Sequence, residues 1–235
     1  MMKSNYKILS ILACGLALSA CQSTTAPSAP APTSLGSSAA SEQSVIAYFS
    51  SMQTGGILLL NSRSADVYRV LIKHDERGYW VQDFYQASHR PQSSPVLLTN
   101  PADLNKISPT SVVGDLTLYY RNGQVYQRAT YNAQHRPMGQ ATTYNPQGKL
   151  IVQEENRADG SYSGRFWYAE TLHQALSLEM NTKNQVTMAK GWDQQQHAIP
   201  SNQCFAEKTL NPKNQQDQCY QLLMQLYQTS ATMAD

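Results

Sequence analysis

The residues of this chain that could do chemistry are few and widely spaced. Its five histidines and four cysteines form no H-E-x-x-H pattern and no Cys-x-x-Cys pair, the spacings typical of zinc sites. No G-x-S-x-G motif presents a nucleophilic serine. A catalytic triad assembles in space and needs no local motif. From the sequence we nevertheless expect a protein that is not an enzyme and that has no metal and no cofactor.

Two short polar clusters have structural explanations. His74-Asp75-Glu76 is dense in metal-ligand types, but Arg77-Gly78 follows at once and favours a hairpin turn. Glu154 and Glu155 are adjacent, so on a strand they point to opposite faces and cannot act as one acid–base pair. Neither cluster predicts a reaction.

The N-terminus has the features of an export signal. Lys3 and Lys7 precede an apolar run from Ile8 to Leu18. That run is too short for a membrane-spanning helix, which needs about 20 apolar residues. A basic segment followed by a short apolar core is typical of a secretory signal. Residues 1–20 are therefore predicted to be a signal peptide.

The residues that end this signal, Leu18-Ser19-Ala20-Cys21, resemble the lipobox of bacterial lipoproteins. The resemblance implies that a diacylglyceryl group is attached to the thiol of Cys21 and that cleavage occurs just before it. Several acyl chains make a stable membrane anchor. Gln22, rather than Asp, follows the cysteine, which by the same resemblance implies the outer membrane, on its periplasmic or its outer face.

Cysteine arithmetic then predicts one disulfide. Cys14 would leave with the signal and Cys21 would carry lipid, so Cys204 and Cys219 remain in an oxidising compartment. The ring of about 16 residues would stabilise the fold by roughly 3 kcal/mol in the chain-entropy model. A redox pair or metal ligands are the alternatives, but neither has its usual spacing.

Charge and composition exclude one class of partner. The chain has 18 Lys and Arg against 16 Asp and Glu, so loss of Lys3 and Lys7 leaves it formally neutral. Nucleic-acid binding usually needs a basic patch, and none is present. Residues 21–44 are rich in Ser, Thr, Ala and Pro and predict a lipidated, disordered tether.

Residues 45–235 predict a single mainly β domain, because short apolar runs alternate with turn signals. Near its end, Cys219, Leu222, Leu223 and Leu226 follow the spacing of an amphipathic helix, expected over about 218–230 and pinned by the disulfide. The segments expected to be strands are Val67–His74, Tyr79–Tyr85, Leu116–Tyr120, Val125–Tyr131, Gln140–Tyr144 and Lys149–Glu155 and, more weakly, Arg165–Tyr168, Ala175–Met180 and Gln185–Lys190.

A repeat of 25 residues runs through the middle of this domain. Gly114, Gly139 and Gly164 are evenly spaced, and the first two units share G-x4-Y-x3-G, with Gly123 and Gly148 in the last position. Asn122-Gly123 fits a two-residue turn of type I′, in which both residues have positive φ. The structural turn residues expected in the repeat are Gly114, Asn122, Gly123, Gly139 and Gly148. One hairpin per unit, over about 114–168, predicts an antiparallel hairpin-repeat sheet.

The segment Leu118-Tyr119-Tyr120-Arg121-Asn122-Gly123, followed by Tyr131 and Gly139, resembles the variant MORN repeat of bacterial YwqK-type proteins. The resemblance covers about 114–155. It implies an open antiparallel sheet that serves as a scaffold or a partner surface, and some members are antidotes to toxins. No catalytic residue comes with it.

A second repeated motif, Y-x-A-x-H-R-P, occurs in residues 85–91 and again in residues 131–137. They could form a paired basic recognition element. They could also be a repeated strand exit in which Pro ends pairing and His89 and His135 are solvated, as loop ends usually are.

These patterns together predict a membrane-anchored, non-enzymatic interaction or scaffold lipoprotein of the cell envelope, with an envelope protein as its partner. An immunity-type lipoprotein that neutralises a toxin is one alternative. An enzyme acting on cell-wall glycan is the alternative from a different class.

Overall fold

The computed structural model describes residues 44–51, 55–210 and 216–233. The predicted signal, Cys21 and the predicted tether up to residue 43 lie outside the described residues. Ser44, the last residue assigned to the tether, is the first residue of a strand. The elements are β1 (Ser44–Phe49), β2 (Leu58–Leu59), β3 (Val67–Asp75), β4 (Gly78–Tyr85), β5 (Val96–Leu98), η1 (Pro101–Asp103), β6 (Val112–Tyr119), β7 (Val125–Tyr131), β8 (Gly139–Tyr144), β9 (Leu150–Asn156), β10 (Tyr162–Trp167), β11 (Gln174–Met180), β12 (Val186–Gly191), η2 (Ser201–Gln203) and α2 (Gln218–Met233).

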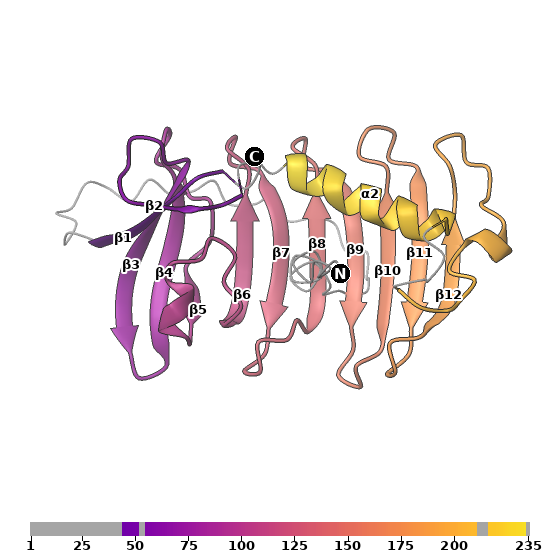
Figure 1. Cartoon of the computed structure of the whole chain (residues 1–235), viewed down its shortest axis with the longest axis horizontal. Coiled ribbons are helices and arrows are strands. Elements are labelled where there is room, and N and C mark those ends of the chain that lie inside the picture. Colours follow the sequence, from indigo (N-terminus) through magenta and orange to yellow (C-terminus); the bar gives the residue numbers. More distant parts are fainter. Residues whose placement is uncertain (1–43, 52–54, 211–215, 234–235) are drawn as a thin grey trace, which may run out of the picture.

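The strands form one open antiparallel sheet in which each strand from β3 to β12 lies beside its neighbour in the chain (Figure 1). Only the N-terminal end departs from this order, because β1 lies between β3 and β2. The prediction of a mainly β, hairpin-built sheet with a C-terminal helix is confirmed. All nine strands expected from the sequence are present, whereas β1, β2 and β5 were not predicted.

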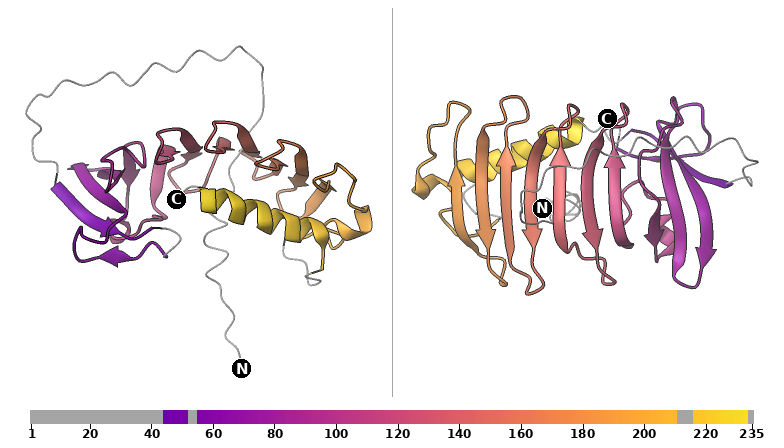
Figure 2. Two further views of the ribbon diagram at one scale, coloured as in Figure 1. Left: turned by 90° about the horizontal axis from the view of Figure 1, so that it is seen from above. Right: turned by 180° about the vertical axis from the view of Figure 1, so that it is seen from behind.

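The helix α2 covers one face of the sheet. Seen from above, the sheet arches and α2 lies under the arch (Figure 2), and it runs across β8 to β12 (Figure 1). Its buried residues include Cys219, Leu222, Leu223 and Leu226, the spacing that predicted it. They pack in one core with the apolar side chains of the strands beneath, such as Phe166, Leu176 and Leu178.

The turn at Asn122–Gly123 is not of type I′. Only Gly123 has a positive φ, of +88°. Its N–H donates to the carbonyl of Tyr120, and the Tyr120 N–H donates to the carbonyl of Gln124, both at 2.8 Å. This is a three-residue loop, a type I turn closed by a left-handed residue that forms a bulge. The Asn122 side chain accepts a hydrogen bond from the N–H of Gln124, which stabilises the longer loop.

The same loop recurs at hairpin after hairpin, with different residues in its left-handed position. That position is held by Gly148 and Gly160 in two hairpins, but by His135, Asn184 and Gln196 in three others. Gly114 and Gly139, by contrast, are not turn residues as the repeat pattern predicted. Gly114 lies inside β6 and Gly139 begins β8.

Side chains where the strands end in hairpin loops join each hairpin to the next by hydrogen bonds. The hydroxyl of Tyr120 donates to the carbonyl of Tyr144 at 2.6 Å, and the hydroxyl of Tyr168 donates to that of Trp192 at 2.8 Å. Between them, the amide of Asn145 donates to the carbonyl of Ala169 at 3.0 Å. This ladder stacks the hairpins in a constant register.

Candidate functional site

The strands under α2 have two chemically distinct faces. On β10, Tyr162, Gly164 and Phe166 are buried toward the helix, while Ser163 and Arg165 alternate with them on the other side. No described helix covers that other side, which is the outer face of the arch (Figure 2). We call this surface, over β6 to β12, the open face.

One row of directly opposed side chains crosses the whole open face. Opposed residues on neighbouring strands project from the same face of a sheet. The register of the seven strands aligns one residue from each, and all seven are polar: Thr117, Arg128, Thr142, Gln153, Arg165, Ser177 and Lys190. We call this the basic row.

The three cations of the basic row are exposed and unpaired. Within the part of the chain that the structure describes, Arg128, Arg165 and Lys190 have no hydrogen bond and no ion pair. Strands lie about 4.8 Å apart, so three strand spacings put Arg128 roughly 14 Å from Arg165, and two put Arg165 roughly 10 Å from Lys190. Three positive charges are therefore held in a line on rigid strands.

A second row, the acidic row, lies about 7 Å away, two residues further along each strand. On β8 to β12 it consists of Gln140, Glu155, Ser163, Glu179 and Met188, and on β6 and β7 of Asp115 and Thr130. Asp115 accepts a hydrogen bond from Thr130 at 2.6 Å, and Glu155 lies 3.5 Å from Arg157. The open face thus has parallel stripes of opposite charge.

A shallow hollow of about 240 Å³ lies between the two rows over β9 to β12. Gln153 and Arg165 of the basic row and Glu155 and Glu179 of the acidic row line it. A hollow of this shape suits side chains of a docking surface rather than an enclosed small molecule.

Glu154 lies on the opposite face from Glu155, as strand alternation predicted. It is 3% exposed, and its carboxylate accepts hydrogen bonds from Tyr162 at 2.9 Å and from Tyr227 of α2 at 2.8 Å. Burial raises the pKa of Glu154 to about 8, and the two tyrosine hydroxyls oppose that shift. The hydrogen bond from Tyr227 joins β9 to α2. Gly164, directly opposite Glu154 on β10, leaves room for the Tyr162 hydroxyl, because a Cβ there would lie 2.7 Å from it.

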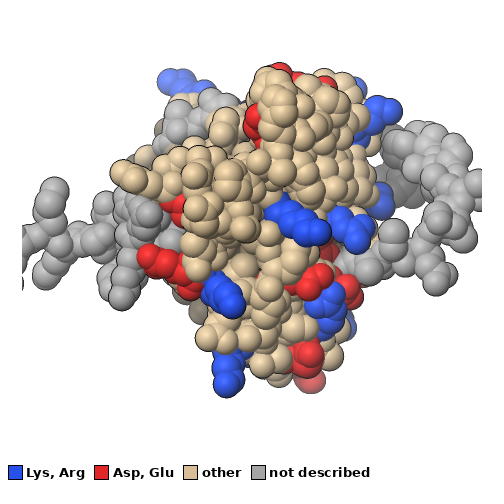
Figure 3. Space-filling view, turned by 90° about the vertical axis from the view of Figure 1, so that its right-hand side faces the viewer, with Lys and Arg blue, Asp and Glu red and all other residues tan. Residues whose placement is uncertain are grey.

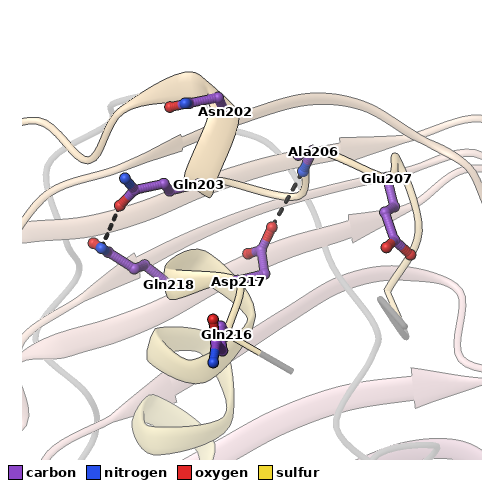
Figure 4. A pocket seen from close by; sticks show the side chains of 7 residues that line it. All are labelled: Asn202, Gln203, Ala206, Glu207, Gln216, Asp217 and Gln218. Carbon is purple, nitrogen blue, oxygen red and sulfur yellow. Dashed lines mark hydrogen bonds between the residues drawn. The ribbon is translucent and has the colours of Figure 1, made fainter. Parts of the chain in front are cut away.

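The predicted disulfide is present between Cys204, just after η2, and Cys219 in the first turn of α2. A second hollow of about 340 Å³ lies beside it, between η2 and the start of α2 (Figure 4). Its polar groups bind one another: Asp217 accepts a hydrogen bond from the N–H of Ala206 at 3.1 Å, and Gln218 donates to Gln203. This hollow is part of the joint between helix and sheet.

In the His74-Asp75-Glu76 cluster, the side chains of His74 and Asp75 contact neighbouring residues of the β3–β4 hairpin. His74 stacks on Tyr79 with ring centroids 4.2 Å apart, and Asp75 pairs with Lys73 at 2.9 Å and with Arg77 at 3.3 Å. Among the described residues no group of three His, Cys, Asp or Glu could hold a metal ion.

His89 and His135 both occupy left-handed turn positions, with φ of +55° and +61°. Their following prolines, Pro91 and Pro137, form isolated bridges with Phe84 and Tyr131 rather than ending all pairing. The two copies of the Y-x-A-x-H-R-P motif, at residues 85–91 and 131–137, therefore form a pair of related hairpin turns.

Sequence reasoning missed the basic row, although the repeat carries its signal. On every second strand the row is occupied by Thr117, Thr142, Arg165 and Lys190, at spacings close to 25 residues. Any strand could be aligned by one residue more or less, and such a slip exchanges the two faces. The register had to be known before the row was visible.

Two further observations concern membranes and charge. Within the described ranges, no helix has both the length and the apolarity needed to cross a bilayer. At the β12 end of the molecule, basic and acidic side chains are interspersed, without a continuous field of one sign (Figure 3).

No protein-family model matches this chain, and a search of curated proteins finds no match.

Proposed function

We propose that this chain is a non-enzymatic interaction lipoprotein of the bacterial envelope, held on the outer membrane by lipid on Cys21, and that its open face binds a protein partner. The observation that carries the proposal is the basic row. Seven polar side chains are aligned across seven strands, and three of them are exposed cations without a partner in the described residues.

Rigid presentation of unpaired charge favours selective recognition. Complementary charges across an interface set orientation, partner choice and association rate more than they add affinity. Side chains on paired strands are also positioned more accurately than side chains on loops. A strand-borne row of cations therefore suits a partner with a matching row of carboxylates.

The acidic row argues that the partner is a protein. A nucleic acid or another polyanion on the basic row would meet Glu155 and Glu179 only about 7 Å away. A protein surface can place a cation and a carboxylate side by side. The anchor is supported by the lipobox-like residues 18–21 and by the tether composition.

Site-specific photocrosslinking in the native envelope tests the proposal. A photoreactive amino acid at Gln153, in the middle of the basic row, should give a discrete adduct with a protein. Replacement of Arg128, Arg165 and Lys190 by Ser should abolish that adduct, because the partner loses its three contacts.

The matched control is the same photoreactive group at Lys183, which is exposed in the turn between β11 and β12. It should give no such adduct. Absence of an adduct at Gln153, or one that persists in the triple Ser variant, would remove the open face as the binding surface. A Cys21→Ala chain that stays membrane-bound like the parent would refute the lipid anchor.

A further inference from the structure

Apolar side chains are exposed at the opposite end of the sheet from β12, on the outermost strand β2 and its flanks. Ile57 is 61% exposed, Leu58 is 44% exposed and Leu60 is fully exposed. Val45, on the adjoining β1, is 40% exposed. Isolated surface leucines are ordinary, but consecutive ones on an edge strand indicate a contact surface.

This edge also lacks charge. Glu42 is the only Asp, Glu, Lys or Arg between Cys21 and Arg63. Natural proteins usually protect an edge strand with charged side chains or proline, which discourage pairing with other chains. Here β2 and the residues before it, Gly55 and Gly56, have no such protection.

The apolar edge is close to the proposed anchor in the sequence. In the sequence, only residues 22–43 separate Cys21 from β1. Tyr48 and Phe49 of β1 pair directly with Leu59 and Leu58 of β2. The apolar edge therefore belongs to the hairpin that follows the tether.

We infer that the apolar edge, formed by Val45, Ile57, Leu58 and Leu60, inserts into the interfacial layer of the membrane that carries the Cys21 lipid. The inference rests on the proposed lipid anchor. Apolar side chains of a peripheral protein gain by entering the boundary between headgroups and acyl chains. Because no cation lies in this segment, insertion needs no anionic lipid.

A partner strand is a weaker occupant of this edge. Strand addition depends on a run of backbone hydrogen bonds along an exposed edge. The strand β2 contains only Leu58 and Leu59, so it offers a very short ladder. Its exposed side chains, not its backbone, are its main contact surface.

Insertion would also orient the open face. In the strand order the edge strand β2 is at one end, and β1, β3, β4 and β5 separate it from the strands of the basic row, β6 to β12. The partner would then be met in the aqueous phase while the first hairpin holds the domain against the membrane.

Spin labelling of the full lipidated chain tests the inference. A nitroxide at Leu60→Cys would be compared with one at Leu172→Cys, which is also an exposed leucine but lies in the turn between β10 and β11. The protein would be bound to vesicles of phosphatidylethanolamine and phosphatidylglycerol, without reductant so that the disulfide stays intact. Accessibility to oxygen and to a water-soluble nickel complex would be measured.

At Leu60 we expect greater accessibility to oxygen than to nickel, with a depth of about 5–10 Å, and at Leu172 the reverse. Replacing phosphatidylglycerol by phosphatidylcholine should leave the depth at Leu60 unchanged. A vesicle-bound protein whose Leu60 label is reached by nickel overturns the inference, as does a label shielded from both reagents, which indicates a protein occupant. A lipidated chain that does not associate with vesicles at all refutes the anchor instead.

Discussion

The two ends of this sheet are held together by different chemistry. Under α2, the strands β9 to β12 bury mainly aliphatic and aromatic side chains, with the carboxyl of Glu154 buried among them. At the N-terminal end, β3 and β4 bury a charged group, Arg69, which is 1% exposed. It makes two hydrogen bonds of 2.7 Å to Asp83 and donates to the carbonyls of Asp103, Leu104 and Lys106.

This difference follows from the connections. Tyr85 donates to the carbonyl of Tyr119 at 2.6 Å, the contact that Tyr120 makes with Tyr144, but 34 residues separate the first pair and 24 the second. The extra residues form β5 and the loop around η1. Polar backbone in such a loop must be satisfied when it is buried. The regular hairpins pair their own backbone N–H and carbonyl groups. In the irregular loop, carbonyls of residues 103, 104 and 106 accept hydrogen bonds from Arg69 instead.

Asp103 is the second buried charged group that stabilises the loop around η1. Burial alone would raise the pKa of Asp103, but hydrogen bonds from Lys106, Ser111 and Thr110 outweigh it and lower the pKa to about 2. Its carboxylate therefore closes the loop that Arg69 holds from the other side. Polar networks of this kind specify one conformation when every member is paired.

The largest effect we expect is from removing Arg69. An Arg69→Met protein leaves Asp83 buried without its partner, which typically costs about 3–5 kcal/mol. Urea unfolding followed by tryptophan fluorescence measures the loss. Lys73→Met is the matched control on the same strand, because its ion pair with Asp75 is exposed and contributes less than about 1 kcal/mol.

Similar unfolding midpoints for the two variants would show that the buried pair does not hold the N-terminal end. A double variant, Arg69→Met with Asp83→Leu, sharpens the result. It should recover much of the loss, since it leaves no unpaired charge.

Loss of the disulfide should have the next largest effect, at the other end. Replacing Cys204 and Cys219 by Ala removes a cross-link between positions 15 apart, worth about 3 kcal/mol in the chain-entropy model. Hydrogen exchange should accelerate in α2 and leave β3 and β4 almost unchanged, because those strands do not contact the helix joint. Faster exchange spread evenly over both ends would mean that the two regions unfold as one unit.

The pH dependence of stability should come from the helix side. The folded pKa of Glu154, about 8, lies above its ordinary value of 4.5. Its contribution to stability is fully present below pH 4.5 and is lost as pH rises toward 8, by at most about 1.4 kcal/mol per pH unit. Tyr162 and Tyr227 keep their protons throughout this range, because burial raises their pKa values.

Urea unfolding between pH 5 and pH 9 checks this direction. A Glu154→Gln protein keeps the acceptor for the two tyrosines and should lose most of the slope. A parent protein that becomes more stable on going from pH 5 to pH 8 would contradict the assignment.

Features of the fold that depend on neighbouring residues could be predicted from the sequence, whereas features that depend on distant residues could not. The Asn-Gly and Asn-Pro-Gln-Gly turns and the spacing of Leu222, Leu223 and Leu226 are local, and they located the hairpins and the helix. The turn type was wrong because the side chain of Asn122 binds Gln124 and favours one more loop residue. The bidentate pair of Arg69 and Asp83 could not be predicted, since it depends on strand register and on a loop whose carbonyls lie 34 to 37 residues later in the chain.

The smallest effect concerns single turns that share one geometry. Gly123 and His135 both take the left-handed position of the same loop, with φ of +88° and +61°. Glycine adopts that conformation without steric cost, whereas other residues pay roughly 1–2 kcal/mol. Gly123→Ala should therefore lower the melting temperature by a few degrees, since nothing lies within 4 Å of the added methyl group and only the backbone is strained.

His135→Gly should raise the melting temperature by less, because the contact of 2.8 Å between the His135 ring and Thr99 is lost at the same time. His135→Asn is the control, because asparagine tolerates the left-handed conformation and should lie between the parent and the Gly variant. A Gly123→Ala protein that melts like the parent would show that the left-handed position of the Gly123 loop carries no backbone strain, and that this turn differs from the one at His135.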